Sequence, residues 1–318
     1  MAGLQIDIYV SIGITWLAAL VALSMRMVAR QLTGIKWWLD DCFSILAFIV
    51  PFNDCIDIFL PGTLHWSLGK RMPDSLGDPA RQAVLYQARK LGFFNSLCYA
   101  TSLAFSKMSI LLFYWRLFKL SAIRLPILIL LIIAPTWLIF RTFMLAFRCV
   151  PTRAIWDKSI PATCKIDGDK FFLATITTHF MLDMIILVLP MVPVCRLRMP
   201  LQQKLAVASF FLLGAIVCIA SCIVLVILIR FPADTKQLPY DYATFCIWGA
   251  VEVNIAVVSG CCPLLRPVIR YICPGLFGST WATRQTTTAS GRAIRLGKTL
   301  KINRTEEDGD SSSTRNLA

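Results

Sequence analysis

Seven long apolar runs follow one another along the chain, separated by shorter polar segments. They cover approximately residues 8–27, 39–60, 93–118, 125–147, 171–194, 205–231 and 243–272. A helix needs about 20 apolar residues to cross the hydrocarbon core of a bilayer. Within each run the apolar residues occupy all sides of the expected helix, which indicates that lipid or other helices surround it. We therefore predict an all-α membrane protein built as a bundle of seven transmembrane helices.

Composition and charge agree with a membrane protein. The chain is 57% hydrophobic and only 16% charged, whereas soluble domains carry about 25% charged residues. The net charge is +14, and the basic residues gather at the ends of the runs and in the C-terminal tail, where they would meet anionic headgroups. We expect membrane lipid as a partner, and no nucleic acid.

The distribution of Lys and Arg predicts the orientation of the bundle. Short loops rich in these residues stay in the cytoplasm, and no Lys or Arg precedes the first run. The first, third and fifth connections are basic through Arg26, Arg30 and Lys36, then Arg116, Lys119 and Arg124, then Arg196, Arg198 and Lys204. We expect the N-terminus outside, the C-terminus in the cytosol, and the plasma membrane as the location.

The chain changes character after the seventh run. Residues 1–272 hold all the apolar runs, whereas residues 273–318 are rich in Ser, Thr and basic residues. A segment of this composition buries too little apolar surface to fold. We predict two parts: a transmembrane domain at 1–272 and a disordered cytosolic tail at 273–318.

Two of the twelve cysteines flank a loop that is expected outside. Most cysteines lie within apolar runs and are expected to pack as small hydrophobic residues. Cys149 and Cys164 instead bound the loop after the fourth run, and an oxidising compartment favours a disulfide between them. Cys55 and Cys98 are either a second pair near the same membrane face or two thiols that remain reduced.

Several short motifs resemble one known family. They are Asp40-Asp41, the stretch 107–118, Cys149-Val-Pro with Trp156 and Cys164, Asp183 followed by Pro190, and Glu252 followed by Cys262-Pro263 and Pro267. Together they resemble the fungal rhodopsin-domain family of seven-helix integral membrane proteins, which includes satratoxin-cluster membrane proteins and appressorial receptor-like proteins. The stretch 67–71 departs from the family, because it has no histidine where many members carry one.

The family name implies retinal, but the sequence does not favour a chromophore. Retinal binds through a Schiff base to a lysine, which rhodopsins place in the seventh helix. The seventh run contains no lysine, and Lys107 is the lysine that lies deep within a run. We expect no retinal and no other cofactor.

Ionisable residues within the runs are the candidate site. Such groups cost at least about 2.5 kcal/mol each at the bilayer centre, so they face the bundle interior and find partners. The candidates for ligand binding are Lys107, His179, Asp183, Glu252 and Asp54. Asp183 and Glu252 are also the candidate catalytic acids if the protein is an enzyme. The alternative is that pairs such as Lys107 with Asp183, or Arg141 with Glu252, only neutralise each other between helices.

Charged residues nearer the cytoplasmic face have simpler interpretations. Asp40 and Asp41 stand at the expected start of the second helix, where carboxylates accept hydrogen bonds from free backbone N–H groups. Arg26 stands at the end of the first run, and we expect its side chain to reach the inner headgroups.

The sequence favours a receptor-like sensor of a small molecule at the cell surface, read in the cytosol by a signalling partner. No phosphate-binding glycine loop, nucleophile elbow or other soluble-enzyme motif is present. Because His65 and His179 are the only histidines, a metal site with several histidines is excluded, and we expect no metal. The alternatives are an intramembrane enzyme of secondary metabolism, such as a cyclase or isomerase, and a metabolite transporter.

Overall fold

The computed structural model describes residues 4–34, 36–54, 68–73, 77–118, 123–191, 201–231 and 237–272, without the side chains of 52–54, 201–210 and 263–272. The chain divides into two compact units, Met1–Val268 and Ile269–Ala318. The helical bundle belongs to the first unit. The predicted tail at 273–318 lies outside the described residues, so its disorder stays a prediction.

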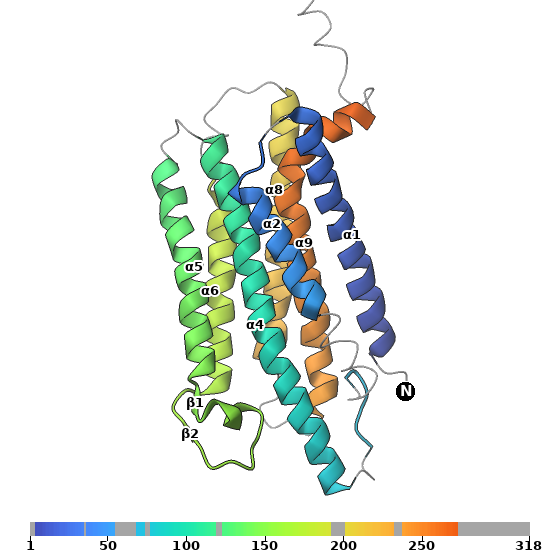
Figure 1. Cartoon of the computed structure of the whole chain (residues 1–318), viewed down its shortest axis with the longest axis vertical. Helices are drawn as coiled ribbons and strands as arrows, with labels where there is room; N and C mark the ends of the chain where they lie inside the picture. The colour runs from blue at the N-terminus through green and yellow to red at the C-terminus, as the bar shows by residue number, and fades with distance from the viewer. Residues whose placement is uncertain are drawn as a thin grey trace, which may run out of the picture. The chain divides into compact units, whose positions relative to one another are not determined.

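Helices make up nearly all of the described chain. They are α1 (Gln5–Thr33), α2 (Leu39–Asp54), α4 (Asp78–Leu117), α5 (Arg124–Ala146), α6 (Gly168–Val188), α8 (Leu201–Ile229) and α9 (Leu238–Ile272). In Figure 1 their axes run roughly side by side along one direction. Six of these seven helices are long and apolar enough to cross a membrane. The chain is therefore an all-α membrane protein, as the hydropathy pattern predicted.

The second helix is described over only part of its apolar run. The run was expected to extend over 39–60, and α2 is described as far as Asp54, while residues 55–60 lie outside the described ranges. The side chain of the candidate Asp54 also lies outside what the structure describes.

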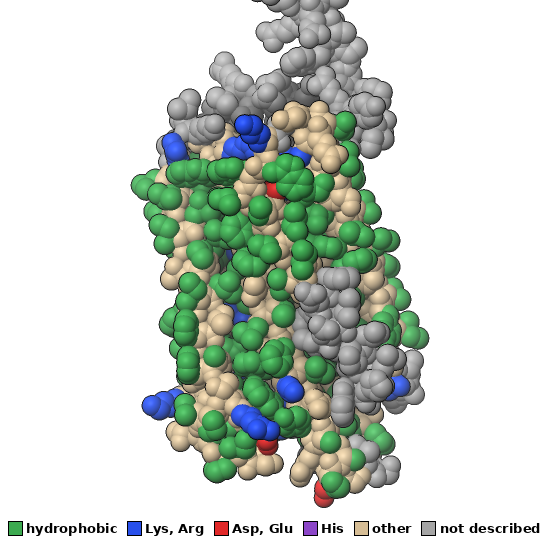
Figure 2. Space-filling view, viewed as in Figure 1, with side chains coloured by type: hydrophobic (Ala, Val, Ile, Leu, Met, Phe, Trp, Pro, Cys, Tyr) green, Lys and Arg blue, Asp and Glu red, His purple; other side chains and the backbone are tan. Residues whose placement is uncertain are grey.

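The outward surface of the bundle is apolar where lipid would surround it. Figure 2 shows hydrophobic side chains over the side of the bundle and Lys or Arg mainly near its two ends. Large aliphatic and aromatic side chains such as Ile14, Ile132 and Phe140 are more than half exposed. In water such an exposed apolar surface would favour aggregation. In a bilayer, lipid chains surround and solvate it.

The third of these helices, α4, begins well before the apolar run that predicted it. The run starts at residue 93, yet α4 starts at Asp78 and extends past its neighbours at its N-terminal end in Figure 1. Pro79 fits the first turn of a helix, where its missing N–H costs nothing. Residues 80–92 are mainly Ala, Gln, Arg, Lys and Leu, which favour helix without being apolar. Hydropathy alone therefore missed this extension.

A short segment links the N-terminal ends of α1 and α9. The backbone N–H of Leu4 donates to the carbonyl of Gly69 at 2.9 Å, and the N–H of Gly69 donates to the carbonyl of Pro239 at 3.0 Å. The amide of Gln237 both accepts from the N–H of Met72 and donates to its carbonyl. Gly69 has a φ of 79°, a left-handed conformation that disfavours residues with a Cβ.

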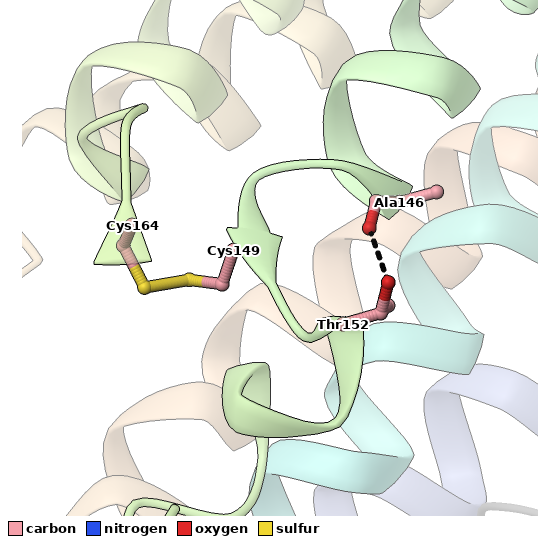
Figure 3. Close-up of a disulfide and its surroundings, with 4 residues drawn as sticks. All are labelled: Ala146, Cys149, Thr152 and Cys164. Atoms are coloured by element: carbon pink, nitrogen blue, oxygen red, sulfur yellow. Dashed lines mark hydrogen bonds between the residues drawn. A yellow bond between two sulfur atoms is a disulfide. The ribbon is translucent and has the colours of Figure 1, made fainter. Parts of the chain in front are cut away.

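A disulfide closes the loop between α5 and α6. The loop contains β1 (Cys149–Val150), the 3₁₀ turn η2 (Thr152–Ile155) and β2 (Thr163–Cys164). The two strands pair antiparallel with Cys149 opposite Cys164, and a disulfide joins these two residues (Figure 3). This is the pair expected from the sequence. Cys55 lies outside the described residues, so the second pairing remains untested.

Side chains also hold this loop against the helices. The hydroxyl of Thr152 donates to the carbonyl of Ala146 at 2.9 Å, as Figure 3 shows. The ring of Trp156 packs on Phe93 of α4, with 5.3 Å between ring centroids. The loop is thus fixed over the same end of the bundle at which α4 and α6 begin.

Candidate functional site

Six polar side chains from four helices meet inside the bundle. Each is at least nine-tenths buried. They are Tyr99 and Lys107 of α4, His179 and Asp183 of α6, Ser221 of α8 and Glu252 of α9, and we call them the central polar cluster. Helix geometry explains part of the grouping, because residues four apart such as His179 and Asp183 lie on one face of a helix.

Glu252 is the hub of the cluster. Its Oε2 accepts a hydrogen bond from the hydroxyl of Tyr99. Its Oε1 accepts from the hydroxyl of Ser221 and lies 2.9 Å from Nε2 of His179. One carboxylate therefore contacts side chains of three other helices. Because a buried charge is costly unless hydrogen bonds satisfy it, these contacts account for a fully buried glutamate.

Asp183 forms the second half of the cluster. Its Oδ1 forms an ion pair with the ammonium of Lys107. Its Oδ2 lies 3.1 Å from Nε2 of His179 and 3.3 Å from the hydroxyl of Ser221. His179 and Ser221 thus stand between the carboxylates of Asp183 and Glu252, within hydrogen-bonding distance of both.

Arg141 does not pair with Glu252. Its guanidinium donates to the carbonyl and the hydroxyl of Ser96 at 2.9 and 3.0 Å, and it lies over the ring of Trp137. The side chain is 2% exposed. Of the two pairings considered from the sequence, the geometry contains Lys107 with Asp183, while Arg141 takes neutral partners.

Sequence reasoning missed two members of the cluster. Tyr99 and Ser221 are neutral residues, and the search for ionisable groups inside apolar runs passed over them. A weak signal exists for Ser221, which stands in the strongly apolar stretch 215–229, where a hydroxyl needs a partner. The sequence holds no comparable signal for Tyr99, since tyrosines are common in membrane helices.

Among the residues that the structure describes, two small cavities adjoin the central polar cluster. The first has a volume of ≈ 30 Å³ and is lined by Tyr99 together with Asn95 and Phe245. The second has a volume of ≈ 40 Å³ and is lined by Lys107 and Asp183. Volumes of this order hold one or a few water molecules, whereas pockets for drug-sized ligands measure about 300–1,000 Å³. In this conformation the site admits water-sized groups.

The cluster also offers the donor types of a metal site. Ligand atoms of His179, Asp183 and Glu252 lie within 4.8 Å of one another. However, the ammonium of Lys107 already balances the charge of Asp183, and the separations from Nε2 to the two carboxylates, 2.9 and 3.1 Å, are hydrogen-bond lengths. The arrangement is that of a hydrogen-bonded cluster.

A second buried network corrects the interpretation of the residues nearer the C-terminal end of α1. Arg26 and Arg30 of α1 bind Asp40 and Asp41 at the start of α2, with N···O separations of 2.6–3.0 Å. Arg26 is 0% exposed and also donates to the carbonyl of Gly260 in α9 at 2.7 Å.

The expectation that Arg26 reaches the headgroups is therefore wrong, and capping is a minor role of the two aspartates. Within the described residues, Asp41 accepts one backbone N–H, that of Trp38, at 3.3 Å. The short connection between α1 and α2 brings two arginines of one helix against two carboxylates of the next. The four charges sum to zero, and burying them costs less free energy when they pair with one another than when they are separate.

The fold and the two buried networks define a multi-pass α-helical membrane protein. Comparison with known sequences makes this specific: the fungal rhodopsin domain matches residues 25–271. The chain belongs to this family. No solved structure matches it.

The names of the relatives refer to a membrane-protein family, to biosynthesis clusters and to a receptor. A SAT4 family membrane protein of Emericella nidulans is 30% identical, over 62% of this chain and 52% of its own length. Wortmanamides biosynthesis cluster protein C of Talaromyces wortmannii is 26% identical, over 81% and 66%. Receptor GIN3 of Arthrobotrys oligospora is 24% identical, over 59% and 47%. The chain thus spans about half to two thirds of the length of these relatives.

Retinal, which the family name implies, does not fit the residues present. The α9 sequence contains no lysine. Lys107 in α4 is ion-paired with Asp183 beside a cavity of ≈ 40 Å³, a volume far below that of a pocket for a ligand of retinal's size.

Proposed function

We propose that this chain is a receptor-like sensor of a small molecule in the fungal plasma membrane. The observation that carries the proposal is the central polar cluster, in which Glu252 contacts side chains of α4, α6 and α8. A ligand that takes over one of these contacts changes how the helices are held together. The name of one relative, Receptor GIN3, supports the proposal.

The two cavities described beside the cluster are smaller than a pocket for a drug-sized ligand. A ligand larger than water has to separate helices around the cluster, and its binding energy then favours the open arrangement over the closed one. The kinks expected at Pro51 in α2 and Pro135 in α5 provide positions where helices bend. The cytosolic loops and tail are the proposed contact for a signalling partner.

An intramembrane enzyme is the second candidate, and one observation favours it. Glu252, His179 and Tyr99 combine acid and base groups in a water-poor site. Several relatives are named for biosynthesis clusters, such as Wortmanamides biosynthesis cluster protein C. In this version Glu252 or Asp183 protonates an apolar substrate that enters from the membrane.

Replacing the gene at its own locus separates the two candidates. The strains carry the wild-type gene, a deletion, Glu252→Gln, or the control Ser24→Ala, whose hydroxyl is exposed and bonds only within α1. Transcripts and metabolites are measured together in all four strains. Glu252→Gln keeps the shape of the side chain and removes its charge.

A sensor predicts that Glu252→Gln reproduces the transcript changes of the deletion, with no new intermediate among the metabolites. An enzyme predicts accumulation of one unreacted precursor. A transporter predicts the normal product on the wrong side of the membrane. If Glu252→Gln matched the wild type in both measurements, the cluster would be purely structural and the proposal would fail.

A further inference from the structure

We propose that the central polar cluster is a proton relay between the two cavities. One cavity is lined by Tyr99, and the other by Lys107 and Asp183. Tyr99 and Lys107 stand eight residues apart on α4, which corresponds to about 12 Å along the helix. The cavities therefore lie at different depths of the bundle, and the cluster fills the space between them.

An unbroken series of hydrogen bonds joins the two cavities. Tyr99 donates to Glu252. From Glu252 the series continues through the hydroxyl of Ser221, or through Nε2 of His179 at 2.9 Å, to Oδ2 of Asp183. Asp183 then contacts the ammonium of Lys107. Every link is a side chain that can gain or lose a proton, and hydrogen bonds in a buried site are stronger than in water. The Ser221 hydroxyl also has the carbonyl of Val217 as an acceptor at 3.1 Å, so it has to turn from that carbonyl to serve the series.

The proton balance closes over one passage. Tyr99 takes a proton from a water in the first cavity as it passes its own to Glu252. The carboxyl group of Glu252 turns so that this proton faces the Ser221 oxygen, and it passes the proton on while the Ser221 hydroxyl, turned toward Asp183, passes its own proton to Oδ2. Lys107 first releases one ammonium proton to water in the second cavity and then takes the proton from Asp183, whose carboxyl group turns to present it. One proton enters, one leaves, and each side chain regains its starting state once the hydroxyl and carboxyl groups turn back.

Charge on neighbouring helices allows the cluster to hold or release one proton. Without an added proton, the cluster contains the ammonium of Lys107 and two carboxylates, a local charge of −1 when His179 is neutral. Arg141 of α5 is the cation that faces Tyr99, at the entry to the series. With one added proton on His179 or Glu252, the cluster is neutral by itself. Cys218 of α8 is a further titratable group that interacts with both carboxylates.

Proton flux into vesicles tests the relay. The purified full chain is reconstituted into liposomes that contain a pH-sensitive dye, and a potassium diffusion potential of either sign drives protons. We expect the wild-type protein to change the internal pH faster than protein-free vesicles. Tyr99→Phe keeps the packed ring and removes the entry hydroxyl, and Glu252→Gln removes the acceptor shared by both branches. Each variant lowers the protein-dependent flux by on the order of a hundredfold.

Matched variants show whether the effect belongs to the relay. Tyr86→Phe removes a hydroxyl from α4 nearer its N-terminus, and Ser24→Ala removes an exposed one from α1; both keep wild-type flux. Ser221→Ala leaves the His179 branch and retains part of the flux. Thermal melting identifies any variant that does not fold.

Two results overturn the proposal. One is folded wild-type protein with no flux above protein-free vesicles at either sign of the potential. The other is a flux that Tyr99→Phe and Glu252→Gln leave unchanged. The relay is independent of the sensor proposed above, because vesicle flux is measured without any ligand or signalling partner.

Discussion

At the scale of single residues, the bundle is organised by charges that have to be paired. Lys107 and Asp183 lie on different helices and form an ion pair of which less than a tenth is exposed. Removing one partner from such a pair leaves an uncompensated charge, which costs more than the pair contributes. The cost is raised here because Glu252 places a second carboxylate on the far side of His179.

Lys107→Met is therefore expected to lower the free energy of unfolding by about 3 kcal/mol. The substitution keeps the length of the side chain and leaves Asp183 without a cation. Adding Asp183→Asn removes the remaining charge and restores most of the loss. Unfolding in detergent, followed by tryptophan fluorescence or circular dichroism, measures all three proteins.

The surface pair of Lys170 with Asp167 provides the control. These residues are 3.5 Å apart on the first turn of α6, and the lysine side chain is 86% exposed. Lys170→Met should change the unfolding free energy by less than about 1 kcal/mol. Equal losses for Lys107→Met and Lys170→Met would show that burial does not strengthen the central pair.

Arg26 differs from Lys107 because it has three acceptors rather than one. Its guanidinium binds Asp40, Asp41 and the carbonyl of Gly260. Arg26→Lys keeps the charge but loses the planar guanidinium, whose N–H groups reach all three acceptors. We expect a loss of about 2 kcal/mol, measured by thermal melting, and a larger loss for Arg26→Met. Wild-type stability in Arg26→Lys would contradict a role for the fork geometry.

At the scale of elements, connections decide how the helix ends are held. The segment 68–73 bonds to the start of α1, to the first turn of α9 and to Gln237, which precedes α9. Gly69 has a positive φ, and a Cβ there would lie 3.1 Å from the side chain of Ile8 and 3.2 Å from the backbone N of Gln5. Both the conformation and the space therefore require glycine.

Gly69→Ala should destabilise the protein by about 1–2 kcal/mol, the cost of a left-handed conformation for a residue with a Cβ. Gly13→Ala is the matched control, because Gly13 stands within α1 with nothing within 4 Å of its Cβ position. That substitution should stabilise by about 0.5–1 kcal/mol. Melting curves of the two variants should shift in opposite directions, and a shared direction would refute the local explanation.

The disulfide stabilises the α5–α6 loop by limiting its unfolded conformations. Cys149 and Cys164 are 15 residues apart, a separation for which the chain-entropy model gives about 3 kcal/mol. Changing both to Ser should lower stability by that order and raise hydrogen exchange at 149–164. Cys222→Ala, at an exposed thiol of α8, serves as the control and should leave exchange in the loop unchanged.

At the scale of the whole molecule, the distribution of positive charge predicts a direction across the membrane. The basic first, third and fifth connections favour an external N-terminus and a cytosolic C-terminus. An epitope tag after Ala318 should be reached by antibody only after the cells are permeabilised, and a tag before Met1 should be reached in intact cells. The tail contains one N-glycosylation sequon, Asn303-Arg-Thr305, and glycosylation at Asn303 would reverse the assignment.

The sequence by itself determined that this is an all-α membrane protein and predicted buried ionisable residues deep within the apolar runs, although it missed the burial of Arg26. The length and hydropathy of an apolar run are read from consecutive residues, so this prediction requires no knowledge of how the helices pack. The same reasoning placed Lys107, His179, Asp183 and Glu252 inside the bundle. The hydropathy pattern underestimated the length of α4, because residues 78–92 favour a helix without being apolar.

Only the tertiary structure decided which of these groups meet. It assigned Lys107 to Asp183, gave Arg141 neutral partners, and placed Tyr99 and Ser221 against Glu252. A helix sequence shows which residues share a face, but the neighbour of that face depends on how the helices rotate and pack. Hydrogen bonds act over about 3 Å, so their partners are fixed only when the bundle is assembled.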